Sequence, residues 1–221
     1  MSTITPVTSS LPFQEYVYLP GVSYATYDAL VTEIEGRRRL RVTYYHGRME
    51  IMAPSQGHER AKTLLAQMIE ALTEELGIPR LSCGSTTFKD QLLDCGLEPD
   101  ECYYVQHEAD VRGRTIKLGE DPPPDLVLEV DITTSVIDRF PVYAALGFPE
   151  IWQYDDGDLV IHLLQENGQY AVAEQSQALP LVRVQKLVEH LDRCDKTDET
   201  TWIRAFRQWV RGGMKAAPNN P

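Results

Sequence analysis

Apolar residues recur with a helical period in the segment that follows Pro54. From Ala61 to Leu76 they return every three or four positions, which predicts an amphipathic helix. Ser55 is suited to cap the start of this helix, and Gly77 is suited to end it. Shorter helices are expected at residues 24–35, 138–146 and 201–213.

Other segments are short, rich in β-branched and aromatic residues, and bounded by turn residues, as is typical of strands. Two such runs flank His46-Gly47, which predicts a hairpin turn. Residues 106–121 are polar, and we expect them to hold a small hairpin. Strands flanked by helices indicate an α/β or α+β domain. The further strands are expected at residues 82–89, 98–105, 122–133, 151–155, 159–165 and 169–175.

The length of 221 residues fits one domain with an ample core. Residues 1–20 are rich in Ser, Thr and Pro and lack a period, so we expect a flexible N-terminal arm there. A single domain is expected over residues 21–211, and a disordered tail over residues 212–221. Apolar runs are too interrupted to span a membrane, and the N-terminus lacks a secretory signal, so a cytoplasmic protein is expected.

The four cysteines match no zinc-binding spacing, and no CxxC motif occurs. In a chain without a secretory signal we expect reduced thiols. The cysteines are Cys83, Cys95, Cys102 and Cys194.

The run PPPDLVLEVDIT places carboxylates on one face of a predicted strand. Residues two apart in a strand point the same way, so Asp125, Glu129 and Asp131 share a face with Val127. Buried carboxylates are costly unless something compensates their charge, and a divalent cation would do so. A metal-dependent active site is therefore the leading hypothesis. The opposite face is apolar and consists of Leu126, Leu128 and Val130.

Four segments together resemble the Uma-type restriction endonuclease family, which is abundant in cyanobacteria and belongs to the PD-(D/E)XK nuclease superfamily. The segments are GRMEIMAPSQGHE, EPDECYYV, PPDLVLEV and DRFPVYAALGFPEIWQYD, within residues 24–190. The resemblance implies a restriction-endonuclease-like mixed sheet flanked by helices, with additional C-terminal strands and a terminal helix. It also implies magnesium-dependent hydrolysis of phosphodiester bonds in DNA, with manganese as a substitute metal. Nucleases that cut both strands often act as dimers, so a homodimer is a further hypothesis.

The resemblance assigns roles to particular carboxylates. Asp100 matches the motif aspartate and Glu129 matches the glutamate of the (D/E)XK element, so both are expected to bind the metal. Asp125 lies on the same predicted strand face as Glu129 and is a candidate third ligand.

The lysine of the superfamily motif is missing, because Asp131 stands two residues after Glu129. In the Uma-type family the lysine moves to the following helix, where the matching position holds Arg139. Arginine keeps the positive charge but cannot donate a proton near neutral pH. Lys89, on a preceding predicted strand, is a substitute candidate.

The first long helix is expected to supply an assisting group. Glu59 and Glu50 are both possible acids, and His58 is a candidate for orienting water or phosphate. Two of these residues have a plain structural alternative. His58 could instead bond to the backbone, and Glu50 could face solvent from the hairpin.

The net charge of −12 opposes long-range attraction to a polyanion such as DNA. A DNA-cutting role therefore requires a locally basic surface, metal ions or a partner. Two alternatives stay open: a catalytically weakened binding or regulatory module on the nuclease fold, and a hydrolase or scaffold unrelated to nucleic acid. The last predicted helix carries an arginine stripe, interpreted as a solvated face or as a phosphate-contacting one: Arg204, Arg207 and Arg211.

Overall fold

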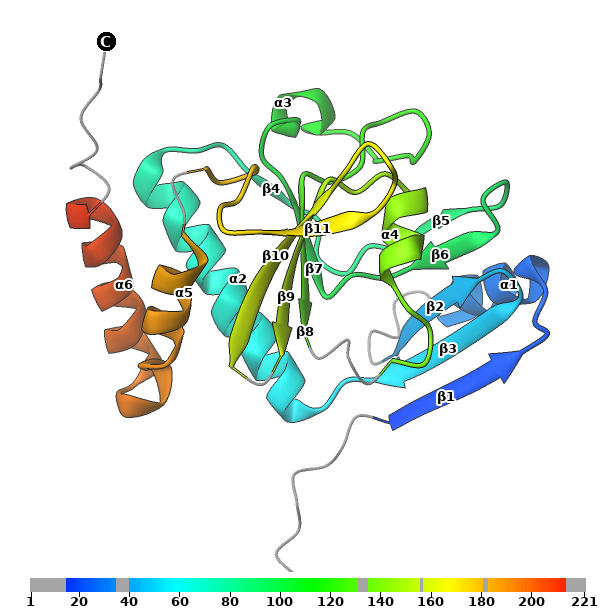
Figure 1. Ribbon diagram of the computed structural model, residues 1–221, viewed down its shortest axis with the longest axis horizontal. Coiled ribbons are helices and arrows are strands. Elements are labelled where there is room, and N and C mark those ends of the chain that lie inside the picture. Colours follow the sequence, from blue (N-terminus) through cyan, green and yellow to red (C-terminus); the bar gives the residue numbers. More distant parts are fainter. Residues whose placement is uncertain (1–14, 35–39, 131–134, 156, 181–182, 214–221) are drawn as a thin grey trace, which may run out of the picture.

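The structure, a computed structural model, describes residues 15–34, 40–130, 135–155, 157–180 and 183–213, and its strands form two sheets (Figure 1). The larger sheet has the strand order β11-β10-β9-β8-β7-β4, and the smaller has the order β1-β3-β2-β6-β5. The larger sheet consists of β4 (Leu81–Ser82), β7 (Glu101–Tyr104), β8 (Leu126–Val130), β9 (Glu150–Asp155), β10 (Asp158–Leu164) and β11 (Tyr170–Ala173). The smaller consists of β1 (Glu15–Pro20), β2 (Arg41–Tyr45), β3 (Arg48–Ala53), β5 (Phe88–Asp90) and β6 (Cys95–Leu97).

Strands β8 and β9 form the only parallel pair among the described strands, and the other pairings are antiparallel. A parallel pair needs a crossover, and the short helix α4 lies within it. This mixed sheet with flanking helices confirms the predicted fold class. None of the described helices combines the length and apolarity needed to cross a membrane. The helices are α1 (Tyr24–Ile34), α2 (Gln56–Leu76), α3 (Glu108–Val111), α4 (Phe140–Ala145), α5 (Val184–Leu191) and α6 (Glu199–Gly213), with a 3-10 turn at Cys194–Lys196.

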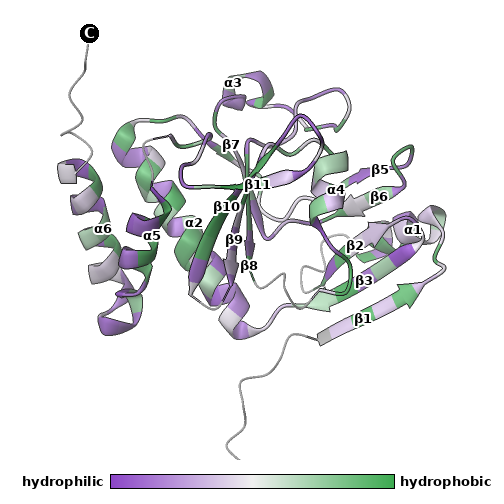
Figure 2. Cartoon of the chain, in the orientation of Figure 1, coloured by the Kyte–Doolittle hydropathy of each residue, from purple (hydrophilic) through white to green (hydrophobic). Residues whose placement is uncertain are grey.

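Helix α2 confirms the predicted period and both predicted ends. Ser55 accepts a hydrogen bond from the His58 N–H at 3.1 Å, and Gly77 ends the helix with a left-handed φ of 65°. Its apolar side packs on one face of the larger sheet, where Figure 2 shows apolar residues in the strands and along the helix. This first core includes Leu65, Met68, Leu72, Leu126, Leu128, Val130 and Trp152.

The opposite face of β8 is also buried. Val127 and Cys102 contribute to a second core, which α4 and the nearest strands of the smaller sheet complete. Glu129 points to this side, because it lies two residues after Val127 on the same strand. The acidic face predicted for β8 is therefore enclosed by protein. The rest of this core includes Phe88, Leu97, Val142, Tyr143, Phe148 and Ile151.

Several elements differ from the sequence-based expectation. Glu15–Pro20, assigned to a flexible arm, form β1, which pairs with the distant strand β3. The strand expected at residues 82–89 is wrong: the chain turns at Gly84, whose φ is 58°, and passes from β4 to β5. Residues 106–121 hold the helix α3 in place of a hairpin. Helix α5 was not expected. The expected tail overlaps the end of α6, and residues 214–221 lie outside the described part.

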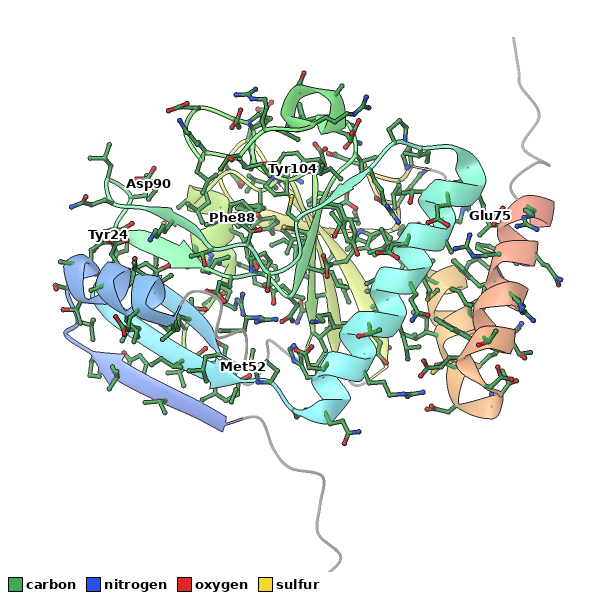
Figure 3. The ribbon with its side chains drawn as sticks, turned by 180° about the vertical axis from the view of Figure 1, so that it is seen from behind. Tyr24, Met52, Glu75, Phe88, Asp90 and Tyr104 are labelled. Atoms are coloured by element: carbon green, nitrogen blue, oxygen red, sulfur yellow. The ribbon has the colours of Figure 1, made fainter. Side chains whose placement is uncertain are left out.

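Two arginines of the predicted stripe attach α6 to α2. Arg207 contacts Glu74 at 2.7 Å and Glu75 at 3.1 Å, and Arg211 contacts Glu75 at 2.5 Å. Arg211, and then Arg207, lower the pKa of Glu75 to about 2. Glu75 faces α6 in Figure 3. These two side chains are thus paired within the chain, and Arg204 is the member of the stripe that lies outside these contacts and is exposed.

The smaller sheet offers a test of close packing at Gly96 in β6. A Cβ added there would lie 2.8 Å from Lys89 Cβ and would overlap the buried Tyr27 hydroxyl. Gly96→Ala is expected to lower the free energy of unfolding by about 1–3 kcal/mol, since an overfilled site forces backbone shifts. Urea denaturation measures this change.

Gly57→Ala is the matched control, because its added methyl meets only Ser55 Oγ at 3.8 Å. This variant lies in α2 and is expected to gain up to about 1 kcal/mol from helix propensity. An undiminished stability of Gly96→Ala would contradict the packing argument.

Candidate active site

The carboxylates of Asp100 and Glu129 face each other across β7 and β8. In this antiparallel pair Glu101 lies opposite Leu128, so the register continued by one residue sets Asp100 opposite Glu129. The Val130 N–H donates to Asp100 Oδ2 at 2.9 Å, which fixes the aspartate against β8. Both carboxylates are buried. The residues that the sequence singles out as motif carboxylates are thus brought together.

Asp100 is held in its ionised form by its neighbours. His58 Nε2 lies 2.9 Å from Asp100 Oδ1, and Arg41 Nε lies 3.8 Å from the same oxygen. Burial alone would raise the pKa of Asp100, but His58, Arg139 and the Val130 N–H bring it below its ordinary value. Hydrogen bonds donated to a carboxylate stabilise its charged form.

Glu129 has one oxygen that is occupied and one that is not. Oε1 accepts from the Tyr143 hydroxyl and contacts Arg139 Nη2 at 2.8 Å. Oε2 is buried and has no hydrogen-bond partner among the described residues. Burial raises the pKa of Glu129 to about 8, although Arg139 opposes the rise. A buried acceptor without a donor is unfavourable, so Oε2 is the oxygen best placed to receive a cation.

The start of α4 places Arg139 over Glu129. Arg139 Nη2 donates to the Glu98 carbonyl at 2.6 Å and lies 3.3 Å from the Tyr143 hydroxyl. Arg139 and Tyr143 are four residues apart, so they meet on one side of the helix. Arg139 is the N-cap residue of α4, and the Phe140 N–H donates to Asp138 Oδ1, one residue before the cap, at 3.0 Å. Tyr143 therefore both packs in the second core and donates to the glutamate.

The first turn of α2 contributes His58 and Glu59 in different ways. The Ser55 cap fixes the backbone of His58, whose buried ring reaches Asp100. The Glu59 side chain is 44% exposed and lies at the rim, 2.7 Å from Lys62 Nζ. Glu59 is therefore a solvent-exposed member of the candidate site.

Arg41 is a member of the site that sequence reasoning missed. It is buried at the start of β2, 3.8 Å from Asp100 and 3.9 Å from Glu59. Its Nε has no hydrogen-bond partner among the described residues. In the sequence it ends a run of arginines that is typical of a solvated surface, so only its strand position could have distinguished it.

Asp125 is not part of this cluster, which corrects its expected role as third ligand. It precedes β8, about 13 Å along the strand from Glu129 at the usual rise per residue. Its Oδ2 accepts from the N–H groups of Val105 and His107 at 2.7 and 3.0 Å, and its Oδ1 lies 2.5 Å from His107 Nδ1. Asp125 and Glu129 thus share a strand face but lie too far apart to hold one ion.

Lys89 also lies elsewhere. It belongs to β5 of the smaller sheet, where its Nζ contacts Asp28 Oδ1 at 2.6 Å. The break at Gly84 separates it from the strand that carries Asp100. The structure therefore leaves Arg139 as the cation at the motif lysine position. Asp131 lies outside the described residues.

The other candidate acid, Glu50, is engaged in holding a loop. Its oxygens accept from Ser135 Oγ and from the Val136 N–H, each at 2.6 Å. Glu150 is similar, because its carboxylate receives four hydrogen bonds. Carboxylates whose oxygens both accept hydrogen bonds have a structural role. Glu129 differs from them because its Oε2 accepts none among the described residues.

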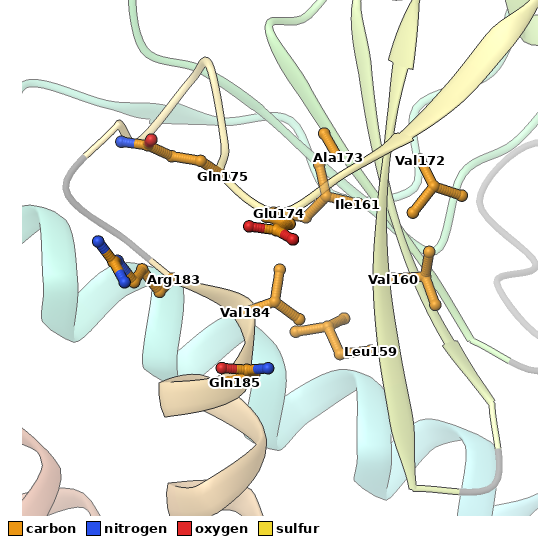
Figure 4. A pocket seen from close by; sticks show the side chains of 10 residues that line it. All are labelled: Leu159, Val160, Ile161, Val172, Ala173, Glu174, Gln175, Arg183, Val184 and Gln185. Atoms are coloured by element: carbon orange, nitrogen blue, oxygen red, sulfur yellow. The ribbon is translucent and has the colours of Figure 1, made fainter.

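Within the described ranges, no three His, Cys, Asp or Glu side chains are placed to hold one metal ion. The candidate site therefore offers a pair of carboxylates. A separate hollow of about 360 Å³ lies between β10, β11 and α5 (Figure 4). Its lining has one acid, Glu174, and one cation, Arg183, so it lacks the paired carboxylates of the site above.

Residues 25–193 match the profile of the Uma2 family, which is described as "Putative restriction endonuclease". The chain belongs to this family. The Uma2 match includes both sheets except β1, and it contains Asp100, Glu129 and Arg139. Helix α6 lies beyond its end. Comparison with curated proteins gives no match.

The burial of Glu129 predicts a pH-dependent stability. Its pKa rises from 4.5 to about 8, so the folded state holds this proton more tightly than the unfolded chain. The resulting stability is complete below the unfolded pKa and is lost as the pH rises through 8. Glu129→Gln, neutral at every pH, is expected to remove this decline, which amounts to a few kcal/mol.

Urea denaturation of both proteins between pH 4.5 and 9, with a chelator present, measures the difference. The wild type should lose stability relative to the glutamine variant across this range. Parallel pH profiles would contradict the elevated pKa of Glu129.

Proposed function

We propose that this Uma2 protein is a metal-dependent endonuclease that hydrolyses phosphodiester bonds in DNA. One observation carries the proposal: the buried, unpartnered Oε2 of Glu129 lies on the strand position opposite the ionised Asp100. Two carboxyl groups buried side by side favour a compensating cation.

The donor set fits magnesium, with manganese as a substitute. Magnesium prefers oxygen ligands and usually retains several waters, so one or two carboxylates suffice. Asp100 and Glu129 would hold it. When bound, such an ion polarises a phosphoryl oxygen and makes water a better nucleophile.

The residues of the chain would then orient and neutralise the reacting groups. His58 fixes Asp100 through Nε2, and Tyr143 fixes Glu129. The guanidinium of Arg139, anchored on the Glu98 carbonyl, offsets negative charge that develops on phosphate. Glu59, at the exposed rim, is the acid placed to accept a proton from water.

The charge of the whole molecule restricts how DNA approaches. At a net charge of −12 the chain repels DNA at long range. Arg41 and Arg139 are cations within the site, and Lys62 lies at its rim. Binding is therefore expected to depend on short-range contacts and on divalent ions.

A second candidate function is a binding or regulatory module with weakened catalysis. The direct Arg139–Glu129 contact favours it, because the arginine occupies an oxygen that a metal would otherwise use. Arginine also cannot supply the proton that a lysine can.

Substitution of either motif carboxylate tests the endonuclease proposal. Asp100→Asn and Glu129→Gln are expected to reduce nicking of supercoiled plasmid DNA with magnesium or manganese by at least about 100-fold. Gel electrophoresis of the plasmid measures cleavage, and circular dichroism checks the fold. Asp125→Asn, which alters a carboxylate away from the site, should retain cleavage. Wild-type protein that leaves every DNA form intact with either metal would overturn the proposal.

Arg139→Lys distinguishes the two candidates. A lysine frees Glu129 Oε1 and restores a group that can donate a proton, so cleavage is expected to rise several-fold above wild type. Arg139→Met removes the charge and is expected to lower cleavage. Activity gained only in the lysine variant would identify the natural protein as the weakened module, whereas a lysine variant slower than wild type would show that the arginine itself serves the reaction.

A further inference from the structure

Cys83 and Cys102 face each other on neighbouring strands, away from any role in the proposed reaction. The register of β4 and β7 pairs Ser82 with Tyr103, so its continuation sets Cys83 opposite Cys102. The Cys83 N–H donates to the Cys102 carbonyl at 2.9 Å, which confirms this pairing. Opposite residues of an antiparallel pair have Cα atoms about 4.5–5.5 Å apart, within the range that a disulfide spans.

The two cysteines are opposite each other but differ in access to solvent. Cys102 Sγ donates at 3.4 Å to the carbonyl of Gly84, the residue that follows Cys83. Cys83 is half-buried, whereas Cys102 is fully buried. Cys83 is therefore the thiol suited to react first.

We propose that Cys83 and Cys102 form a reversible disulfide in response to hydroperoxides. The Cys83 thiolate attacks one peroxide oxygen, the O–O bond breaks, and the leaving alkoxide or hydroxide takes a proton. Cys83 is then a sulfenic acid. The Cys102 thiol attacks its sulfur, the S–O bond breaks, and water leaves with the thiol proton. The two thiols together lose two electrons. An organic hydroperoxide is reduced to one alcohol and one water, and hydrogen peroxide is reduced to two waters.

The disulfide would act on the strand that carries Asp100. Cys102 lies two residues after Asp100 on β7, and both side chains point to the same face. Strand β4, at the edge of the sheet, is paired with β7 over only two residues. A disulfide would thus join the end of β4 covalently to β7, next to Asp100 and Glu129. This inference is independent of nuclease activity.

Peptide mapping of the full chain tests the pair. Reduced protein is treated with hydrogen peroxide, blocked with iodoacetamide, digested with trypsin and analysed by mass spectrometry. We expect the peptides of residues 81–89 and 90–112 to be joined, and the link to vanish with dithiothreitol. Thiol titration of the unfolded protein should fall from four thiols to two. Thermal unfolding should shift upward by about 5 °C, since the link closes a loop in the unfolded chain.

Two variants assign the link, because residues 90–112 also contain Cys95. Cys95→Ser should keep the cross-link, and Cys83→Ser should abolish it. The half-buried position of Cys83 allows the serine variant to fold. A link to Cys95, Cys194 or a second chain would overturn the proposal, as would four remaining thiols or oxidation that stops on Cys83 alone.

Discussion

The site depends on an arginine–glutamate pair that is removed from water. Arg139 and Glu129 are both buried, and their contact lies in the second core. Removal from water costs several kcal/mol for each group that stays ionised, and the contact between the two groups only partly offsets this cost. The same burial raises the pKa of Glu129 to about 8. An apolar pair of the same volume would stabilise the fold as well or better. Stability alone therefore does not account for these two residues, and chemistry or recognition provides a better reason for them.

The fold meets the requirements of this pair with groups from distant parts of the chain. The Glu98 carbonyl, just before β7, fixes the guanidinium, and the hydroxyl of Tyr143 in α4 fixes the carboxylate. Helix α4 lies in the crossover between the parallel strands β8 and β9. Its Tyr143 can therefore contact Glu129 on β8, the strand that precedes the helix. Asp100 and His58 complete the arrangement from β7 and α2. Each polar group is thus positioned by an element whose own packing is apolar.

The parts of this structure that were predictable from the sequence are those whose signals are local. The period and caps of α2, the His46-Gly47 turn and the two Pro-Asp segments were all recognised, and a family resemblance connected Asp100 with Glu129. The shared strand face suggested Asp125 as a ligand, but its separation of four residues from Glu129, about 13 Å along a strand, is too large for one ion. Strand pairing between distant segments was also hidden, which explains the missed β1 and the misplaced Lys89. Arg41 was missed because its arginine run resembles a solvated surface.

The family match ends at residue 193, but the apolar packing continues into α6. Trp202, Phe206 and Val210 pack in the same core as Leu65 and Met68 of α2. A polypeptide trimmed to residue 193 would expose the apolar side chains that α6 covers, and exposed apolar surface of that kind promotes aggregation. The unit that folds in this protein is therefore longer than the segment that matches the family.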